Sequence, residues 1–188
     1  MSDNVYAAPS ANLDEHFHSS EEDRFYVVST RKMLILFFLT FGLFQLHWNF
    51  QNWQRHKRAT GDDVWPLPRA LFALFFTHTL YHEVADYDPS GKGRSWNSDT
   101  YATGMVFLML AGYALSWAGT GSLLLDVVSI LLLIPTGLLL KRVQLEINIR
   151  SGDPAGSSND NFTAANIVWC VLGALAWFFF AIGLLLVR

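Results

Sequence analysis

Residues 101–140 read YATGMVFLMLAGYALSWAGTGSLLLDVVSILLLIPTGLLL, and residues 164–187 read AANIVWCVLGALAWFFFAIGLLLV. The first stretch contains a single carboxylate, Asp126, and the second contains none. An α-helix rises about 1.5 Å per residue, so about 20 apolar residues cross a hydrocarbon core of about 30 Å. A soluble helix of this length would carry a polar face, which these stretches lack. The two stretches therefore predict a polytopic membrane protein.

The rest of the chain extends this prediction to an all-α fold with four transmembrane helices and one short re-entrant or interfacial helix. The short helix covers residues 70–84, which would extend only about 22 Å and cannot cross unaided. Pro135 predicts a kink in the span that contains it, because proline removes a backbone donor. Residues 141–150 alternate apolar and polar side chains, and we interpret them as a helical extension into the interface. The four predicted spans cover residues 33–53, 101–118, 122–140 and 164–187.

Domain organisation follows from the same pattern. We expect a disordered acidic tail over 1–24, an aromatic N-terminal helical hairpin domain over 25–85, a loop over 86–100 and a three-helix transmembrane bundle over 101–188. Lys and Arg residues favour the cytoplasmic side of a membrane. With four spans, nine Lys and Arg residues lie on one side of the membrane and four on the other. With five spans, eight lie on one side and five on the other. A third arrangement folds the two early elements as a re-entrant pair, so the topology stays open.

Composition limits the partners of the chain. Its 188 residues are 52% hydrophobic and 15% charged, and the net charge of −3 offers no basic face for nucleic acid. No P-loop, dinucleotide fingerprint or nucleophile–base pattern is present, so we expect no cofactor and no enzymatic activity. The expected partners are membrane lipids and either another membrane protein or a second copy of the chain.

The segment from Phe25 to Ala70 resembles small bacterial inner-membrane proteins that carry a domain of unknown function. These proteins share an aromatic-Val-Ser start, a Thr-x-Gly inside the first helix and a Trp-rich exit before a basic stretch. The resemblance implies a multi-pass protein of the bacterial inner membrane and implies no catalytic activity. The matching residues are Phe25, Tyr26, Val28, Ser29, Lys32, Thr40, Gly42, Trp48, Asn52, Trp53, Arg69 and Ala70.

Three residues spaced four apart form a candidate metal site. His78, His82 and Asp86 would share one face of a helix, with Glu83 beside them. Two histidines at this spacing can bind one transition metal, with a carboxylate as third ligand. The pattern lacks the glutamate that directly follows the first histidine of a metalloprotease helix. The alternative interpretation is an amphipathic helix whose polar face meets water or lipid headgroups.

Two further residues are candidates because of their charge. Asp126 is an acid inside an apolar run, where ionisable groups are costly and often functional. It is a candidate for ion coupling, or else it caps a helix start at headgroup depth. Arg69 follows Pro68 at the start of the short helix, where a cation is poorly matched to the helix dipole. We therefore interpret it as a ligand for lipid phosphate.

Small side chains recur every four residues at Gly112, Ser116 and Thr120. In lipid such a face allows close helix packing, which is the role that we expect here. The leading functional hypothesis is a structural or adaptor subunit that binds a membrane partner or lipid. One alternative is a transporter or channel component that uses Asp126 and the Pro135 kink. The other is a metal- or lipid-handling enzyme around His78 and His82.

Overall fold

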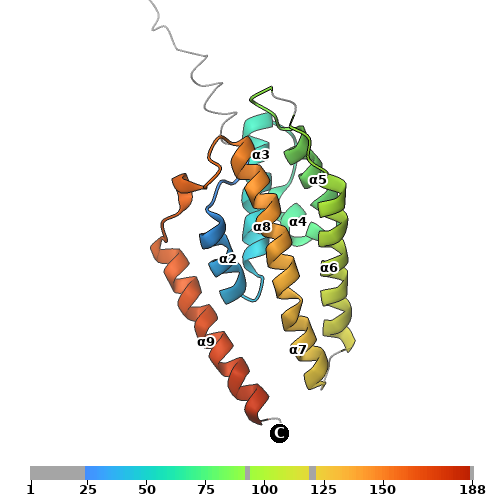
Figure 1. Ribbon diagram of the computed structural model, residues 1–188, viewed down its shortest axis with the longest axis vertical. Coiled ribbons are helices and arrows are strands. Elements are labelled where there is room, and N and C mark those ends of the chain that lie inside the picture. The colour runs from blue at the N-terminus through green and yellow to red at the C-terminus, as the bar shows by residue number, and fades with distance from the viewer. Residues whose placement is uncertain (1–23, 92–93, 119–121, 187–188) are drawn as a thin grey trace, which may run out of the picture.

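The chain is helical throughout the part that the structure describes. The computed structural model describes residues 24–91, 94–118 and 122–186, so the predicted tail lies outside it except for Arg24 (Figure 1). No strand occurs within these ranges, which confirms the all-α prediction. The elements are α2 (Thr30–Leu39), α3 (Phe44–Thr60), α4 (Pro66–Leu71), α5 (Ala73–Asp86), α6 (Ser98–Ala118), α7 (Leu123–Leu131), α8 (Leu133–Arg150), the 3-10 turn η1 (Ser157–Asn159) and α9 (Ala164–Leu186).

Three stretches of the described chain are long and apolar enough to cross a membrane. They are α6 over Ser98–Ala118, the combined α7 and α8 over Leu123–Arg150, and α9 over Ala164–Gly183. The prediction of four transmembrane helices is therefore wrong by one. Residues 33–53 are the segment that forms no span, because they fold as two helices instead of one.

The first apolar run is broken because its backbone turns between α2 and α3. Phe41 and Gly42 have positive φ angles of 52° and 83°. The Thr40 hydroxyl donates to the Leu36 carbonyl oxygen at 2.7 Å and accepts from the Phe44 N–H at 3.0 Å, which closes the turn. The ten residues of α2 rise only about 15 Å, half of a hydrocarbon core. Because α3 runs back toward the side where α2 begins, the two helices form a re-entrant hairpin (Figure 1).

The other helices follow their predictions more closely. The short helix expected over 70–84 is present as α5, which has 14 residues. The helix that contains Pro135 is interrupted at Leu132, where α7 ends and α8 begins, as the missing proline donor predicts. Residues 141–150 are helical, but Gln144 and Asn148 within them are fully buried and do not face the interface.

An extended segment precedes α2 and lies between α3 and α8. Its backbone groups are buried without a neighbouring strand, and such groups require partners. Side-chain amides supply them: the Tyr26 N–H donates to Asn52 Oδ1 at 3.0 Å, and Gln144 Nε2 donates to the Tyr26 carbonyl at 2.9 Å. Asn148 Nδ2 donates to the Val28 carbonyl at 3.0 Å. These amides take the place of a strand and fix the segment to both helices.

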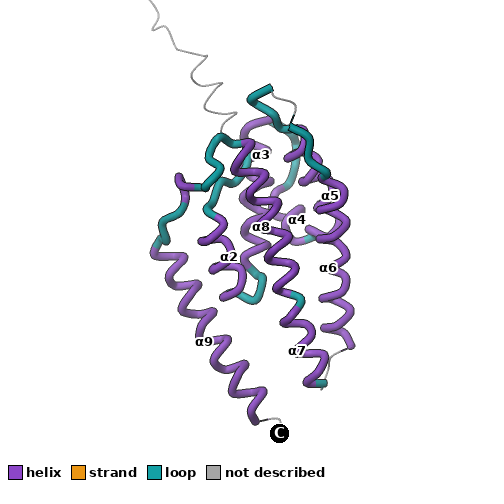
Figure 2. Tube along the Cα trace, viewed as in Figure 1, coloured by secondary structure: helices purple, strands orange, loops and turns teal. Residues whose placement is uncertain are grey.

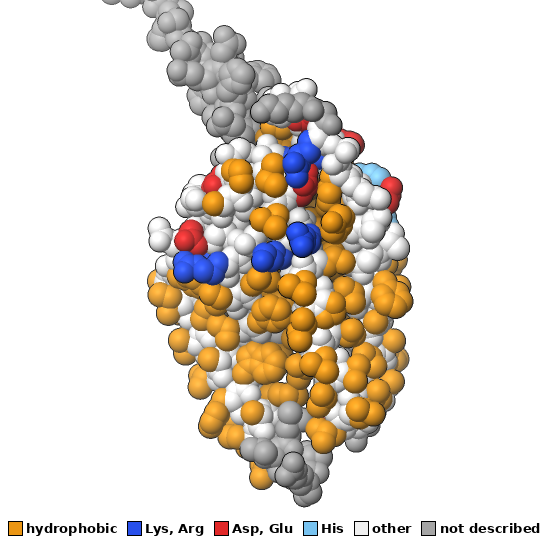
Figure 3. Space-filling view, in the orientation of Figure 1, with side chains coloured by type: hydrophobic (Ala, Val, Ile, Leu, Met, Phe, Trp, Pro, Cys, Tyr) orange, Lys and Arg blue, Asp and Glu red, His pale blue; other side chains and the backbone are white. Residues whose placement is uncertain are grey.

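Loops and charged side chains gather at one end of the molecule, which we call the polar end. Figure 2 shows the loops around the upper ends of α3, α5 and α8. Figure 3 shows the charged side chains of the same face in its upper half, above a hydrophobic lower half. The re-entrant hairpin is part of this single body, because α2 packs against both α8 and α9.

Candidate functional site

A cavity of about 490 Å³ lies beside the turn of the re-entrant hairpin, bordered by α6 and α7. We call it the hairpin cavity. Most of its lining is apolar, and no charged side chain contributes to it. Its polar side chains are Gln45, Asn49, Tyr113, Ser116, Ser129 and Thr136.

The hairpin cavity lies at the depth of the hydrocarbon core. Lys141 and Arg142 are the first charged residues after the apolar run of α7 and α8, so they mark the headgroup level. Counting back along the helix from Lys141, Thr136 lies ~7.5 Å deeper and Ser129 lies ~18 Å deeper. Half of a hydrocarbon core is about 15 Å. The cavity therefore extends from just below the headgroups to about the middle of the bilayer.

Two carboxamides of α3 line the hairpin cavity. Asn49 is 4% exposed, and its Nδ2 donates to the Gln45 carbonyl oxygen at 2.9 Å. Gln45 Nε2 donates to Met105 Sδ at 3.5 Å, and a thioether is a weak acceptor. No described residue donates a hydrogen bond to Asn49 Oδ1 or to Gln45 Oε1. Because both residues line the cavity, their amide oxygens can accept a hydrogen bond from a donor inside it.

A second cavity of about 420 Å³ lies between the re-entrant hairpin and the first turns of α9. Its lining includes Trp169 of α9 and Phe44 of α3. Leu43 and Leu46 line both cavities, and their exposed fractions are 62% and 41%. The turn of the hairpin is therefore flanked by open apolar space on two sides.

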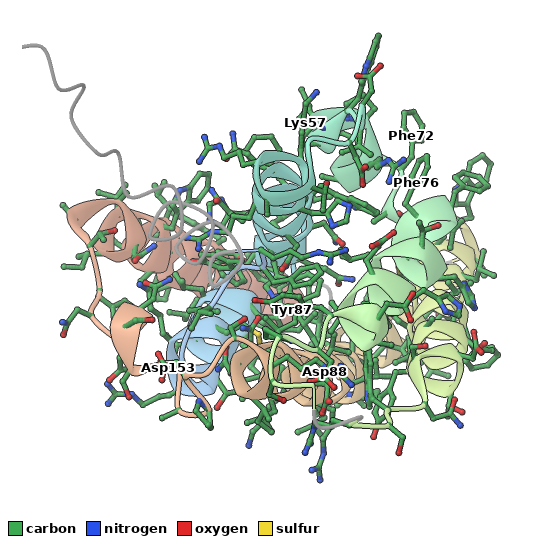
Figure 4. All side chains as sticks on the ribbon, turned by 90° about the horizontal axis from the view of Figure 1, so that it is seen from above. Lys57, Phe72, Phe76, Tyr87, Asp88 and Asp153 are labelled. Atoms are coloured by element: carbon green, nitrogen blue, oxygen red, sulfur yellow. The ribbon has the colours of Figure 1, made fainter. Side chains whose placement is uncertain are left out.

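A cluster of charged side chains surrounds His56, which is buried at the polar end. His56 Nε2 lies 3.0 Å from Asp62 Oδ2, and its Nδ1 lies 3.9 Å from Glu83 Oε2. Arg24 pairs with Glu83 at 2.7 Å, and its guanidinium lies 5.5 Å from the centre of the Tyr87 ring. Viewed from the polar end, Tyr87 lies near the middle of the molecule (Figure 4). The cluster joins the start of the described chain to α3 and α5.

The environment of His56 predicts a loss of stability in acid. Burial lowers the pKa of the His56 imidazole below its ordinary value, and Arg24 acts in the same direction, whereas Glu83 and Asp62 oppose the change. The unfolded chain therefore binds this proton more readily than the folded chain does. The stabilising contribution is present above the ordinary pKa of 6.5 and is lost as the pH falls from there toward the folded-state pKa.

We expect the melting temperature to fall between about pH 7.5 and about pH 5, and to fall less steeply in His56→Gln. Differential scanning fluorimetry in detergent measures both slopes. The slope is the readout, because His56→Gln also removes packing and lowers stability at every pH. Equal slopes in the two proteins would exclude His56 as the titrating group.

The predicted metal ligands are not brought together. His78 Nε2 lies 3.3 Å from Thr103 Oγ1, and His82 Nε2 lies 2.9 Å from Asp99 Oδ1. Both partners belong to α6, and Asp86 is exposed at the end of α5. Within the described ranges, no group of three His, Cys, Asp or Glu side chains could hold a metal ion. The spacing of the two histidines corresponds instead to the packing of α5 against α6.

The two charged candidates lie in ordinary structural settings. Asp126 is exposed in the first turn of α7, where a carboxylate is favourable against the helix dipole. The Arg69 guanidinium lies over the Trp53 ring, 4.2 Å from its centre, and 5.2 Å from the centre of the Phe76 ring. These cation–π contacts account for the position of a cation on the short helix.

The face of small residues borders a cavity. Gly112 and Ser116 both line the hairpin cavity, whereas Thr120 lies outside the described residues. A Cβ atom added at Gly112 would meet no atom within 4 Å. Close approach occurs instead at glycines outside this face: a Cβ at Gly137 would lie 2.9 Å from Phe38 Cζ.

Sequence reasoning missed the carboxamides of the hairpin cavity. They lie within residues 33–53, which the sequence predicts as a transmembrane span. On a helix Gln45 and Asn49 share a face at i, i+4 spacing, and this face turns inward toward α6. That spacing, next to the buried Trp48, is the signal that could have found them.

Comparison with protein families, curated proteins and solved structures finds no match to this chain. Its function is therefore inferred from the geometry of the hairpin cavity and of the polar end.

Proposed function

We propose that this chain is a small multi-pass protein of the bacterial inner membrane that binds a lipid chain in the hairpin cavity and acts as a structural or adaptor subunit. The observation that carries the proposal is the cavity itself. Its volume of about 490 Å³ falls in the range of ligand pockets, about 300–1,000 Å³. At its depth in the bilayer, hydrocarbon is the available occupant. The resemblance of residues 25–70 supports the bacterial location.

The lining of the hairpin cavity favours a ligand with an uncharged end. A charged group at this depth would be costly without a charged partner, and none lines the cavity. The open oxygens of Gln45 and Asn49 accept hydrogen bonds, so they favour a hydroxyl or amide donor on the ligand. The proposal is therefore a lipid chain whose neutral polar group faces α3.

The polar end supports a structural role because several of its buried polar side chains hold the fold through hydrogen bonds within the chain. Gln144 and Asn148 hold the extended segment before α2. Lys32 Nζ donates to Asn159 Oδ1 at 2.6 Å and to the Asn161 carbonyl at 2.7 Å. Side chains committed to the fold in this way are not available for acid–base chemistry.

Filling the hairpin cavity tests the proposal. Gly112→Leu adds a side chain where a Cβ meets no neighbour, and leucine also favours the helix over glycine by roughly 1 kcal/mol. We expect the variant to fold and to carry less than half of the lipid that copurifies with the wild-type protein. Ala114→Leu is the matched control, since Ala114 is exposed on α6 and does not line the cavity. Mass spectrometry of protein purified in mild detergent measures the bound lipid.

Equal lipid content in Gly112→Leu and Ala114→Leu would contradict binding in this cavity. The same preparation tests the adaptor role, because a stoichiometric membrane protein should copurify from native membranes. Asp126→Asn should leave an adaptor intact, whereas a transporter that uses this carboxylate would lose ion-coupled flux. Asp126 is exposed, and His78 and His82 each contact a residue of α6, so neither alternative is favoured by a specific site in the described residues.

A further inference from the structure

The positive charges of the described residues lie toward one end of the membrane spans. Residues 95–140 and 151–187 contain no Lys or Arg. The chain has thirteen Lys and Arg residues, of which only Lys92 and Arg188 lie outside the described ranges. The others belong to the segment before α2, to the re-entrant hairpin, to the helices and loops between it and α6, or to the last part of α8 at the polar end. The positive-inside rule therefore assigns the polar end to the cytoplasm.

Three of these cations lie at one level, where the hydrophobic surface begins. Phe38 of α2 packs against Gly137 of α8, and the two helices run in opposite directions there (Figure 1). Counted from this contact at about 1.5 Å per residue, Lys141 and Arg142 lie ~6–8 Å toward the polar end, and Arg31 lies ~10 Å toward it. We call these three residues the basic belt. Figure 3 shows Lys and Arg side chains in a row directly above the hydrophobic half of this face.

The basic belt has hydrogen-bond donors that no described residue occupies. Arg142 is exposed and Lys141 is half-buried, and no described residue forms a hydrogen bond or an ion pair with either of them. The Arg31 side chain is 71% exposed and makes one ion pair, with Asp160 at 3.2 Å. The belt therefore keeps a net positive charge beside the headgroup level. Leu138, one turn deeper on α8, is 53% exposed and faces the hydrocarbon.

We propose that the basic belt binds the phosphate groups of anionic phospholipids in the cytoplasmic leaflet. Cations just above an apolar surface meet the headgroups of the leaflet in which the protein sits, and each contributes to attraction for anionic lipid. Charge selects the ligand, because an anionic headgroup is attracted to the net positive charge of the belt, whereas a zwitterionic headgroup brings its own cation. This site differs from the hairpin cavity in position and in the charge of its ligand, so the two can fail independently.

A lipid titration tests the belt. The full chain in detergent is titrated with phosphatidylglycerol or with phosphatidylcholine, and binding is followed by native mass spectrometry or by thermal shift. We expect the wild-type protein to prefer phosphatidylglycerol and the variant K141Q/R142Q to lose roughly tenfold or more of that preference. Arg58→Gln is the matched control, since it removes an exposed cation of α3 outside the belt and should keep the preference. Absence of a preference in the wild type, or its survival in K141Q/R142Q, overturns the proposal.

Orientation provides a second readout that does not depend on affinity. In a Cys170→Ser background, Ser158→Cys places the only thiol at the polar end and Ser122→Cys places it at the start of α7. An impermeant maleimide should label Ser122→Cys in intact cells and Ser158→Cys only after lysis. The reverse pattern would place the belt in the outer leaflet and overturn the cytoplasmic assignment.

Discussion

Arg150→Met is expected to lower the free energy of unfolding by about 3–5 kcal/mol, because it leaves a buried carboxylate without its buried cationic partner. The side chains of Arg150 and Glu146 are 2% and 7% exposed, and Arg150 Nε lies 2.9 Å from Glu146 Oε1. Arg150 Nη1 also donates to the carbonyl oxygens of Ala85 and Tyr87, each at 2.8 Å. Its Nη2 donates to the Arg94 carbonyl at 2.7 Å. One guanidinium thus joins the end of α8 to both ends of the connection between α5 and α6.

Thermal unfolding in detergent measures this loss. For a chain of this length, 3–5 kcal/mol corresponds to a fall in melting temperature of roughly 10 °C. Arg58→Met, at an exposed position of α3, should change stability by no more than about 0.5 kcal/mol. A fall of equal size in both variants would mean that charge or helix propensity, and not the buried network, is responsible.

A double variant separates the ion pair from the carbonyl contacts. Glu146→Gln with Arg150→Met removes both charges, so it should be less destabilised than the sum of the two single variants. Arg94 limits this coupling, because its Nε also lies 2.7 Å from Glu146 Oε1 and neutralises part of the charge that Arg150→Met leaves. Simple additivity would show that Arg150 acts mainly through the backbone carbonyls.

The spans could be predicted from sequence because their signal is local. A run of about 20 apolar residues has few alternatives to a membrane helix, and Pro135 interrupts its own helix through its missing donor. The re-entrant hairpin could not be predicted in the same way. Its apolar run has the composition of a span, and what divides it is the turn that Thr40 closes in front of Phe41 and Gly42.

The polar residues of α8 and α3 show a second limit of sequence reasoning. Gln144 and Asn148 have the composition of an interfacial helix, yet they are buried because an extended segment more than a hundred residues away needs their amides. Asn49 similarly lines a cavity whose other walls include α6, α7 and α8. Burial of this kind depends on contacts across the chain, which no local pattern contains.

Gly173→Leu is expected to separate α9 from α2, because these helices meet backbone to backbone. A Cβ at Gly173 would overlap the Leu39 carbonyl oxygen and would lie 2.7 Å from the Leu39 carbonyl carbon. The contact continues one turn further along α9, at Trp177. The Trp177 Nε1 donates to the Phe38 carbonyl at 2.9 Å, and the Trp177 ring stacks on the Phe41 ring with centres 4.1 Å apart. The obstacle is backbone and cannot rotate away, so the cost exceeds the ~1–3 kcal/mol typical of over-packing.

The native cysteine reports this separation. Cys170 lies about one turn before Gly173 on α9, is half-buried and packs against the core. Its reaction with a maleimide in detergent should be several-fold faster in Gly173→Leu than in the wild-type protein. Gly183→Leu is the matched control, since a Cβ there meets no atom within 4 Å and the rate should not change. An unchanged rate in Gly173→Leu would mean that α9 is held by contacts other than its packing on α2. A faster rate in that variant alone would establish this glycine as the point where the last span joins the fold.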